Sequence, residues 1–270
     1  MPVFNAGNHL RVAVNSIINQ TYKNWELIII DDGSTDDSIK SLDNIEDHRI
    51  SIIRDGKNKG LAARLNQIID MAKGHFIARM DQDDISYPNR FSIQINYFER
   101  FNSLDLIGSK AICISEKNKP VGYLPFKASH KELTATPWRG FYLPHSTWIG
   151  KVEWFRRHRY ANPAPYLCED QELLLRTHSD SKFSAINSVL LAYRVKDKVL
   201  RSKLLKTRWS VFKAYSSYFL KNKQLFFLVL TLIALIGRIF QDLLKFNFTN
   251  TIVKVEDKNI LKDICRLNDV

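Results

Sequence analysis

The sequence has few cysteines and no visible leader segment. Its three cysteines, Cys113, Cys168 and Cys265, are odd in number and include no C-x-x-C pair, which argues against a disulfide framework and a thiolate zinc site. The chain does not begin with a charged region followed by an apolar one, so no signal peptide is visible. We therefore expect a protein of the reducing, cytoplasmic side of the membrane.

Acidic residues are also in deficit, which predicts an acidic partner. The 40 Lys and Arg residues outnumber 28 Asp and Glu and give a net charge of +12. Nucleic acid, anionic lipid or a phosphorylated substrate would match that charge. A glycine-rich basic loop for a triphosphate is missing, because residues 1–20 contain only Gly7, and Arg11 is their one basic side chain besides His9. This argues against a nucleotidyltransferase.

The hydrophobic pattern predicts an α/β fold. Runs of β-branched and apolar residues predict strands at 25–30, 50–54 and 76–80, and helical spacing predicts helices at 12–18, 38–42 and 61–72. This alternation favours a parallel sheet with ligands bound where strands end in loops. Residues 105–194 are less regular and richer in proline, which predicts a mixed sheet with long loops and a helix from about Glu169 to Arg176.

Acidic residues follow two of the predicted strands. Asp31 and Asp32 follow the first strand, and Asp81 and Asp83 follow the strand at 76–80. Two carboxylates spaced in this way at a strand end can bind Mg²⁺ or Mn²⁺, which prefer oxygen ligands. Aspartate is also common in turns and at helix N-caps, so an isolated D-x-D is a weak signal. Two clusters at one sheet edge make a nucleotide site the better interpretation.

In this order the motifs resemble the family 2 glycosyltransferases. The resemblance spans about residues 1–195 and consists of MPVFN at 1–5, DDGSTD at 31–36, NKGLA at 58–62 with Asn66, AKG at 72–74, and ARMDQDD at 78–84 with Pro88 and Arg90. It implies a GT-A fold, in which a Rossmann-like mixed sheet is flanked by helices. It also implies inverting, metal-dependent transfer of a sugar from a nucleotide-diphosphate sugar, usually a UDP-sugar, in the synthesis of bacterial surface polysaccharide.

The resemblance implies a role for each matching residue. Pro2, Phe4 and Asp32 would line the pocket for the base. Asp81 would contact the ribose or a metal-bound water, and Asp83 would bind the Mn²⁺ or Mg²⁺ that bridges the donor phosphates. Asp81 is also a candidate ligand of this metal. The other residues expected at the nucleotide sugar are Asn5, Asn58, Gly60 and Asn66.

A second set of residues would serve the acceptor. Glu169 and Asp170 resemble the E-D pair that precedes a helix in the family, which makes Asp170 the general base for the acceptor hydroxyl. The same two carboxylates could instead complement the dipole of the helix. The segment from Pro144 to Thr147 resembles a P-H-x-[ST] motif and places His145, with Glu169, on the acceptor side.

The chain departs from the family at its N-terminus. Family members have several β-branched residues before the Pro-Val-Phe-Asn segment, whereas this sequence starts at Met1-Pro2. We expect a truncated first strand, whose loss would cost several kcal/mol of a total stability of about 5–15 kcal/mol. The alternative function is therefore a catalytically inactive, membrane-associated relative with an incomplete nucleotide site.

The composition changes after residue 195. A basic stretch from Arg194 to Lys213 contains Asp197 as its only acid, and residues 225–237 are apolar apart from Thr231. This run is short against the ~20 residues of a membrane span, so we expect an interfacial or re-entrant helix, with a full span as the alternative.

We therefore predict two parts, a catalytic domain at 1–195 and a basic, hydrophobic, membrane-proximal helical extension at 196–270. Residues 196–245 would hold the protein, as a peripheral or anchored one, at the inner face of the cell membrane. Positive charge beside an apolar run fits an anionic leaflet, and a glycan or lipid-linked acceptor, better than nucleic acid.

Overall fold

The computed structural model of the protein describes residues 1–196 and 201–244. Residues 197–200 and 245–270 of the predicted extension, including Cys265, lie outside this part, and the two described cysteines are buried and free. The first elements are β1 (Pro2–Val3), α1 (His9–Ile18), β2 (Leu27–Asp31), the short 3₁₀ helix η1 (Ile39–Leu42), β3 (Ile50–Arg54), α2 (Leu61–Met71), β4 (Phe76–Ala78), β5 (Ile85–Ser86) and α3 (Arg90–Arg100).

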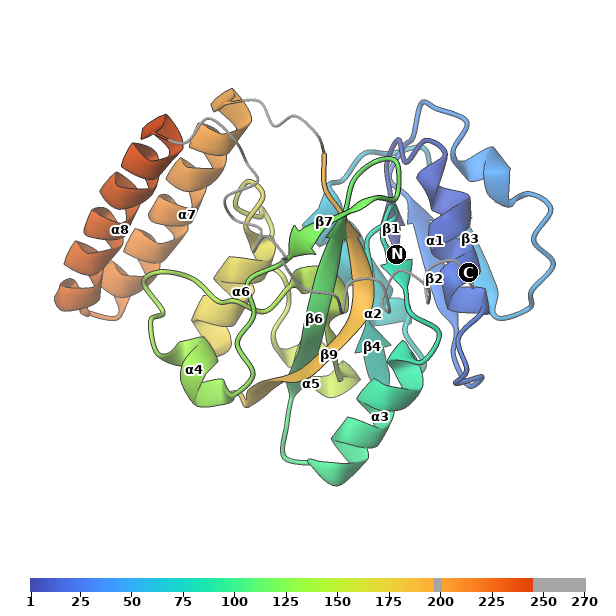
Figure 1. The fold of residues 1–270 in the computed structure, drawn as a ribbon, viewed down its shortest axis with the longest axis horizontal. Coiled ribbons are helices and arrows are strands. Elements are labelled where there is room, and N and C mark those ends of the chain that lie inside the picture. The colour runs from blue at the N-terminus through green and yellow to red at the C-terminus, as the bar shows by residue number, and fades with distance from the viewer. Residues whose placement is uncertain (197–200, 245–270) are drawn as a thin grey trace.

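The remaining elements contain the longest strands and the C-terminal helices. They are β6 (Leu106–Ile114), β7 (Pro120–Tyr123), α4 (His130–Thr134), η2 (His145–Thr147), β8 (Ile149–Lys151), α5 (Val152–Arg157), α6 (Glu169–Thr177), β9 (Phe183–Arg194), α7 (Arg201–Lys221) and α8 (Leu225–Leu244). Figure 1 shows α7 and α8 side by side at one end of the molecule, with α6 between them and the long strands.

The N-terminal sheet is parallel, with the strand order β1-β2-β3. Strand β2 is buried along its whole length because helices cover both of its faces. Leu27 and Ile29 pack with the apolar residues of α1, and Ile28 and Ile30 pack with Ile68 of α2. A strand covered on both faces needs a continuous apolar run rather than an alternating one, and the sequence Leu-Ile-Ile-Ile supplies it.

The second sheet is mixed, as expected, with the order β4-β8-β6-β9-β5 and β7 beside β6. Strands β6 and β9 are parallel and the other pairs are antiparallel. One expectation was wrong: β4 does not continue the parallel sheet of β1–β3 in the described part of the chain but pairs antiparallel with β8. The physical reason is that β1 offers only Pro2 and Val3, and both pair with β2.

A small cavity lies between β1 and β4. Met1 and Pro2 line it on one side and Ile77 to Met80 on the other, with Leu65 and Ile69 of α2 beneath them. The two sheets are nevertheless joined across this region, because α2 and α5 pack together and the loops after β1 and β4 are hydrogen-bonded to each other.

Helices α7 and α8 form a hairpin that packs on α6 through the fully buried side chains of Tyr215 and Phe219. The outer face of α8 has no such cover. Leu225 to Asp242 has a mean hydropathy of 1.9 and is 6% buried, so by length and composition this helix could cross a membrane. Its exposed apolar side chains recur at helical spacing: Leu225, Phe226, Val229, Leu232, Ile233, Ile236 and Phe240.

Gly150 of β8 packs closely against Leu106 and Phe155, and its replacement tests the packing of the core. A Cβ on Gly150 would lie 2.8 Å from both Leu106 Cδ1 and Phe155 Cε2 and 3.1 Å from the carbonyl oxygen of Asp105. We expect Gly150→Ala to lower the free energy of unfolding by about 1–3 kcal/mol through overpacking. Gly237→Ala in α8 is the control, since nothing lies within 4 Å of its Cβ and alanine favours helix. Thermal unfolding monitored by circular dichroism compares the two. Equal melting temperatures for both variants would contradict this packing.

Candidate active site

The loop between β4 and β5 holds the acidic cluster Asp81, Asp83 and Asp84. The Arg79 guanidinium binds Asp81 through two contacts, Nη2 to Oδ1 at 2.5 Å and Nη1 to Oδ2 at 2.8 Å. Ser146 Oγ donates to the same Oδ2 at 2.9 Å and accepts from Arg79 Nη1 at 2.6 Å. Asp81 is thus fixed by a buried cation and by the segment that contains His145.

The other two carboxylates of the cluster lack a neutralising partner of this kind. Burial raises the pKa of Asp84 to about 8, with further contributions from Asp81 and Asp83, and its Oδ2 is buried without a hydrogen bond. Burial and the charge of Asp81 also raise the pKa of Asp83. The loop is held by Arg194, whose Nε donates to the carbonyl oxygen of Asp83 at 2.8 Å and whose backbone N–H donates to Asp84 Oδ1 at 2.9 Å.

The middle residue of the D-Q-D motif connects the acidic cluster to the N-terminal loop. Gln82 Oε1 accepts from the Phe4 N–H at 2.7 Å, and Gln82 Nε2 donates to the Phe4 carbonyl at 3.0 Å. The Phe4 ring itself is 45% exposed. The Asn5 side chain accepts from the Thr35 N–H at 2.8 Å, so this loop is also tied to the segment after β2. The loops at the ends of β1, β2 and β4 therefore converge.

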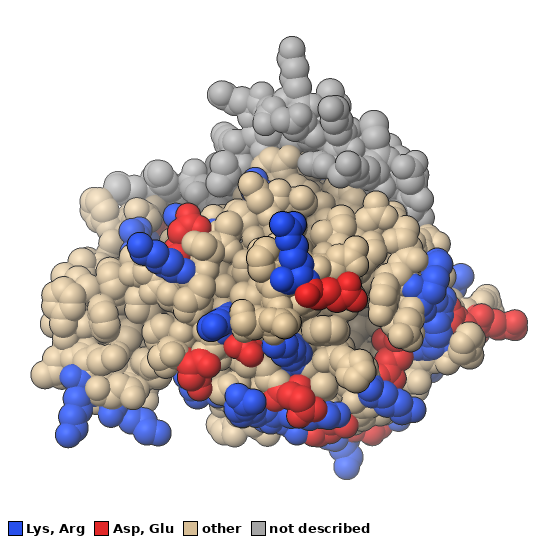
Figure 2. All heavy atoms as spheres, turned by 90° about the horizontal axis from the view of Figure 1, so that it is seen from below, with Lys and Arg blue, Asp and Glu red and all other residues tan. Residues whose placement is uncertain are grey.

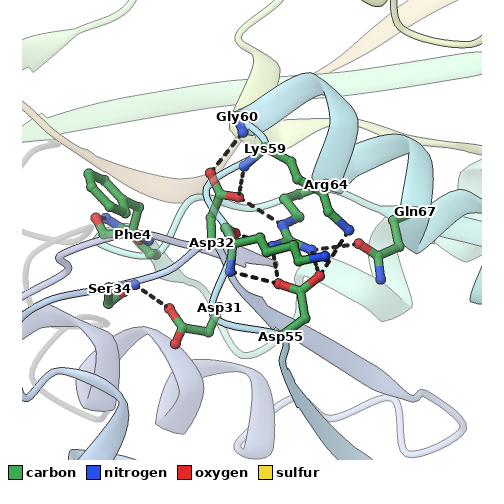
Figure 3. A network of polar contacts seen from close by, with 11 residues as sticks. Phe4, Asp31, Asp32, Ser34, Asp55, Lys59, Gly60, Arg64 and Gln67 are labelled. Atoms are coloured by element: carbon green, nitrogen blue, oxygen red, sulfur yellow. Dashed lines mark hydrogen bonds and ion pairs between the residues drawn. The ribbon is translucent and has the colours of Figure 1, made fainter.

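Asp32 is buried and fully engaged within the chain (Figure 3). Its Oδ1 accepts from the Lys59 N–H at 2.7 Å and from Arg64 Nε at 2.8 Å, and its Oδ2 accepts from the Gly60 N–H at 3.0 Å. Arg64 in turn binds Asp55 at 2.6 Å, and this contact holds the pKa of Asp55 well below its usual range. The network fixes the loop at 57–60 against the end of β2.

The acceptor-side candidates are linked through Tyr160. Asn66 binds the Tyr160 backbone with both ends of its amide, at 2.9 and 3.0 Å. The Tyr160 hydroxyl is 2.8 Å from His145 Nε2, and His145 Nδ1 is 3.7 Å from Glu169 Oε1. Burial, together with the charge of Arg79, lowers the pKa of His145 well below its ordinary value. His145 is therefore neutral at pH 7 and can accept or donate one hydrogen bond at each end.

Glu169 and Asp170 begin α6 and share one poorly solvated environment. Burial raises the pKa of Glu169 to about 7, and the neighbouring charge of Asp170 adds to this shift. Burial also raises the pKa of Asp170, against the effect of a hydrogen bond from Gln171 Nε2 at 3.1 Å. Arg79 favours the charged form of both carboxylates. Its guanidinium thus binds Asp81 directly, and its charge also acts on the carboxylates at the start of α6.

The structure brings most of the sequence-based candidates together. Phe4, Asp81, His145 and Glu169 are connected by the contacts above, and Pro2 belongs to β1, whose Val3 carbonyl accepts from the Asp32 N–H at 2.7 Å. Two candidates are placed differently. The Asn66 amide is occupied by Tyr160, and Asn58 is exposed, with its backbone against Gly33. The roles of all these residues toward a ligand stay predictions.

Sequence reasoning overlooked four residues that hold the site. Arg64 is completely buried although it is charged, and its position on the apolar face of α2, one turn before Ile68, was the available signal. Arg194 was counted with the basic stretch but is 7% exposed and holds the acidic loop. Arg79 and Gln82 are part of the acidic motif itself, where only the aspartates were considered.

The donor set of the acidic loop suits a hard divalent cation. Carboxylate oxygens are the ligands that Mg²⁺ and Mn²⁺ prefer, and one such oxygen, Asp84 Oδ2, is buried without a partner. Within residues 1–196 and 201–244 no group of three His, Cys, Asp or Glu side chains is placed to hold an ion.

Several known proteins are similar to this chain in sequence. The sequence model described as Glycosyl transferase family 2 matches residues 1–159. EpsE of Bacillus subtilis (strain 168) is 37% identical over 119 residues, which are 43% of this chain and 43% of EpsE. The UDP-Glc:alpha-D-GlcNAc-diphosphoundecaprenol beta-1,3-glucosyltransferase WfgD of Escherichia coli is 30% identical over 221 residues, or 78% of this chain and 83% of WfgD. The chain thus spans less than half the length of EpsE and most of WfgD.

Solved structures agree on the architecture. Staphylococcus aureus TarS (1–349) in complex with UDP-GlcNAc has a TM-score of 0.63 at 14% identity, over 92% of this chain and 75% of that one. The mannosyltransferase PcManGT from Pyrobaculum calidifontis, in complex with GDP-Man and Mn²⁺, has a TM-score of 0.60 at 12% identity, over 80% and 62%. This likeness confirms the GT-A fold. Together with the match over residues 1–159, it shows that the chain belongs to glycosyl transferase family 2.

Proposed function

We propose that this protein transfers a sugar, with inversion, from a nucleotide-diphosphate sugar to a glycan or lipid-linked acceptor in the synthesis of surface polysaccharide. The observation that supports this most is the link between the two groups of carboxylates. Ser146 binds Asp81 in the acidic loop, and the adjacent His145 lies 3.7 Å from Glu169 at the start of α6. The Arg79 guanidinium binds Asp81, and its charge favours the ionised forms of Glu169 and Asp170. A donor diphosphate at the acidic loop and an acceptor hydroxyl at Asp170 would then meet in one site.

The donor is proposed to be a UDP-sugar. WfgD is named as an enzyme that uses UDP-Glc and a lipid diphosphate acceptor, and TarS was solved with UDP-GlcNAc. The base would lie on the exposed ring of Phe4, beside Pro2 and Asp32. Because both oxygens of Asp32 already accept hydrogen bonds from residues 59–64, its contribution would be to hold the Lys57–Gly60 loop beside the base.

Asp83, with Asp81 beside it, would hold a divalent cation, Mn²⁺ or Mg²⁺. When bound, such an ion acts as a Lewis acid on the departing nucleoside diphosphate. PcManGT was solved with Mn²⁺ and its sugar nucleotide. In this chain Arg194 and Gln82 keep the loop in place, and the ion pair with Arg79 orients Asp81.

Asp170 would take the proton of the acceptor hydroxyl. Its carboxylate is fixed by hydrogen bonds, one of them from Gln171 Nε2 to Oδ2 at 3.1 Å. A base with a raised pKa is also a stronger proton acceptor than an ordinary carboxylate. Glu169 and the neutral His145 would lie beside the acceptor.

The hairpin of α7 and α8 is proposed to bind the inner face of the cell membrane. Residues 201–244 contain eight Lys and Arg residues and a single acid, Asp242, which pairs with Arg208 at 3.1 Å. Figure 2 shows mostly uncharged atoms at the end of the molecule where the hairpin lies, with basic side chains beside them. An exposed apolar stripe flanked by cations fits the boundary between acyl chains and anionic headgroups.

Asp83→Asn tests the metal site. The amide is a poorer ligand than the carboxylate, so we expect transfer with Mn²⁺ to fall by on the order of 10²-fold or more, with an unchanged melting temperature. Asp37→Asn at the surface is the matched control. Transfer of radiolabelled sugar is measured across a panel of nucleotide sugars. A fully active Asp83→Asn protein would remove this residue from the mechanism, and a wild-type protein inactive with every donor would favour the inactive relative.

Asp170→Asn tests the base. We expect turnover to fall by about 10²–10⁴-fold with little change in the KM for the donor, because the amide cannot accept the proton. Glu172→Gln, in the same first helical turn, is the control. If the acidic residues only complemented the helix dipole, the two variants would behave alike. For the wild type, activity should be lost as pH falls from neutral, at a higher pH than for an ordinary aspartate, since the pKa of Asp170 is raised.

Ile233→Glu tests membrane binding. Ile233 is 58% exposed, so the substitution should leave the fold intact while placing a charge on the lipid-facing stripe. We expect binding to phosphatidylglycerol vesicles to weaken by about tenfold or more and wild-type binding to weaken with added salt. Ile93→Glu, at a 37% exposed position in α3, is the control and should bind as the wild type does. Sedimentation with vesicles gives the measurement, and undiminished pelleting of Ile233→Glu would contradict the proposal.

A further inference from the structure

The side-chain amide of Gln171, the residue after the proposed base, makes four hydrogen bonds. Its Oε1 accepts from the Phe141 N–H at 2.8 Å and from the Tyr215 hydroxyl at 3.2 Å. Its Nε2 donates to the Phe141 carbonyl at 3.2 Å and to Asp170 Oδ2 at 3.1 Å. The Phe141 N–H can only donate, and the Phe141 carbonyl and the Asp170 carboxylate accept, so a flipped amide would lose these three bonds. The orientation of the N–H that faces Asp170 is therefore determined by its partners.

Two of the groups around this amide come from the C-terminal hairpin. Tyr215 belongs to α7 and is completely buried, so its hydroxyl reaches Gln171 from within the core. Arg238 belongs to α8 and donates to the carbonyl of Arg139, two residues before Phe141. Figure 1 shows α6 beside this hairpin. Both helices thus contact the short segment and the side chain that adjoin the base.

Gly140 shows how tightly these groups are packed. A Cβ at this position would lie 2.9 Å from Gln171 Oε1, 3.6 Å from the Tyr215 hydroxyl and 3.8 Å from Arg238 Nη2. The residue also has φ of +105°, a conformation that side chains rarely adopt. The 139–141 segment therefore fits between α6 and the hairpin only with glycine at its centre.

We infer that Tyr215 and Gln171 are positioning residues, through which the C-terminal hairpin orients the Asp170 carboxylate toward the acceptor. The inference rests on the proposed role of Asp170 as the base. The Gln171 Nε2–H engages Oδ2 and so fixes the orientation of the carboxylate, and the Tyr215 hydroxyl keeps that N–H in place. Because the hairpin is also the proposed membrane surface, the part of the protein that meets the lipid and the group that activates the acceptor are rigidly connected.

Tyr215→Phe tests the connection, since it removes the hydroxyl and keeps the buried ring. We expect kcat to fall about three- to tenfold, the usual effect of one hydrogen bond, with the donor KM and melting temperature unchanged. The acidic limb of the pH profile should move to higher pH, because the hydrogen bond from Gln171 favours the charged form of Asp170. Tyr218→Phe is the matched control: it lies one turn further along α7, and its hydroxyl does not reach Gln171.

The shift of the acidic limb isolates the hydrogen bond because the charges around Asp170 stay in place. The ionisable groups that face it are Arg79, Glu169, Tyr160, Cys168 and Tyr215 itself. Tyr215 is uncharged at neutral pH, since burial raises its pKa. Replacing it by phenylalanine thus leaves the number of charges around the base unchanged.

Gln171→Glu is a second variant for the case that Tyr215→Phe does not fold. It leaves the buried Tyr215 side chain unchanged. Its new oxygen would face Asp170 Oδ2 and the Phe141 carbonyl, so the acidic limb should move further than in Tyr215→Phe. Kinetics and pH profiles of Tyr215→Phe equal to those of Tyr218→Phe would overturn the inference, as would a lower melting temperature with an unmoved pH profile. Full activity of Asp170→Asn would instead refute the proposed function, so the two failures can be distinguished.

Discussion

The arrangement of this site depends on the collection of many carboxylates near the buried guanidinium of Arg79. Arg79 is 6% exposed and neutralises Asp81 directly, while Asp83, Asp84, Glu169 and Asp170 are left with raised pKa values. Such an excess of buried negative charge is costly unless a ligand compensates it. A site of this kind favours a bound cation and a proton in transit, which are the two elements of the proposed transfer.

Hydrophobic spacing along the sequence predicted several strands and helices correctly. The strand at 50–54 is confirmed by β3, and the helices at 61–72 and from Glu169 are confirmed by α2 and α6. The segment at 38–42 is a 3₁₀ helix rather than the expected helix, because it spans only four residues. The fold class could also be predicted. The acidic segments do converge, as expected, but through the hydrogen bonds of Gln82 and Asn5 between loops of two sheets and not at the edge of one parallel sheet.

The contacts that hold the site could not be predicted, because their partners are far apart in the chain. Arg194 follows the acidic loop by more than a hundred residues and reaches it only through the pairing of β9 with β5. Tyr215 reaches Gln171 across the packing of α7 on α6. In each case the residue type was visible, but the tertiary structure determined its partner. The sequence offered one signal of such contacts, a charged residue at the end of a strand, as Arg194 is, or on the apolar face of a helix, as Arg64 is.

The amide of Gln82 has a consequence for the variable position of the D-x-D motif. Its two bonds to the backbone of Phe4 resemble the paired hydrogen bonds between two strands. The residue between the aspartates therefore connects two loops. An alanine there would keep both acids and yet free the N-terminal loop from them. A chimaera that exchanges the first loop to change the proposed base pocket would have to exchange residue 82 with it, although this side chain belongs to the acidic loop after β4.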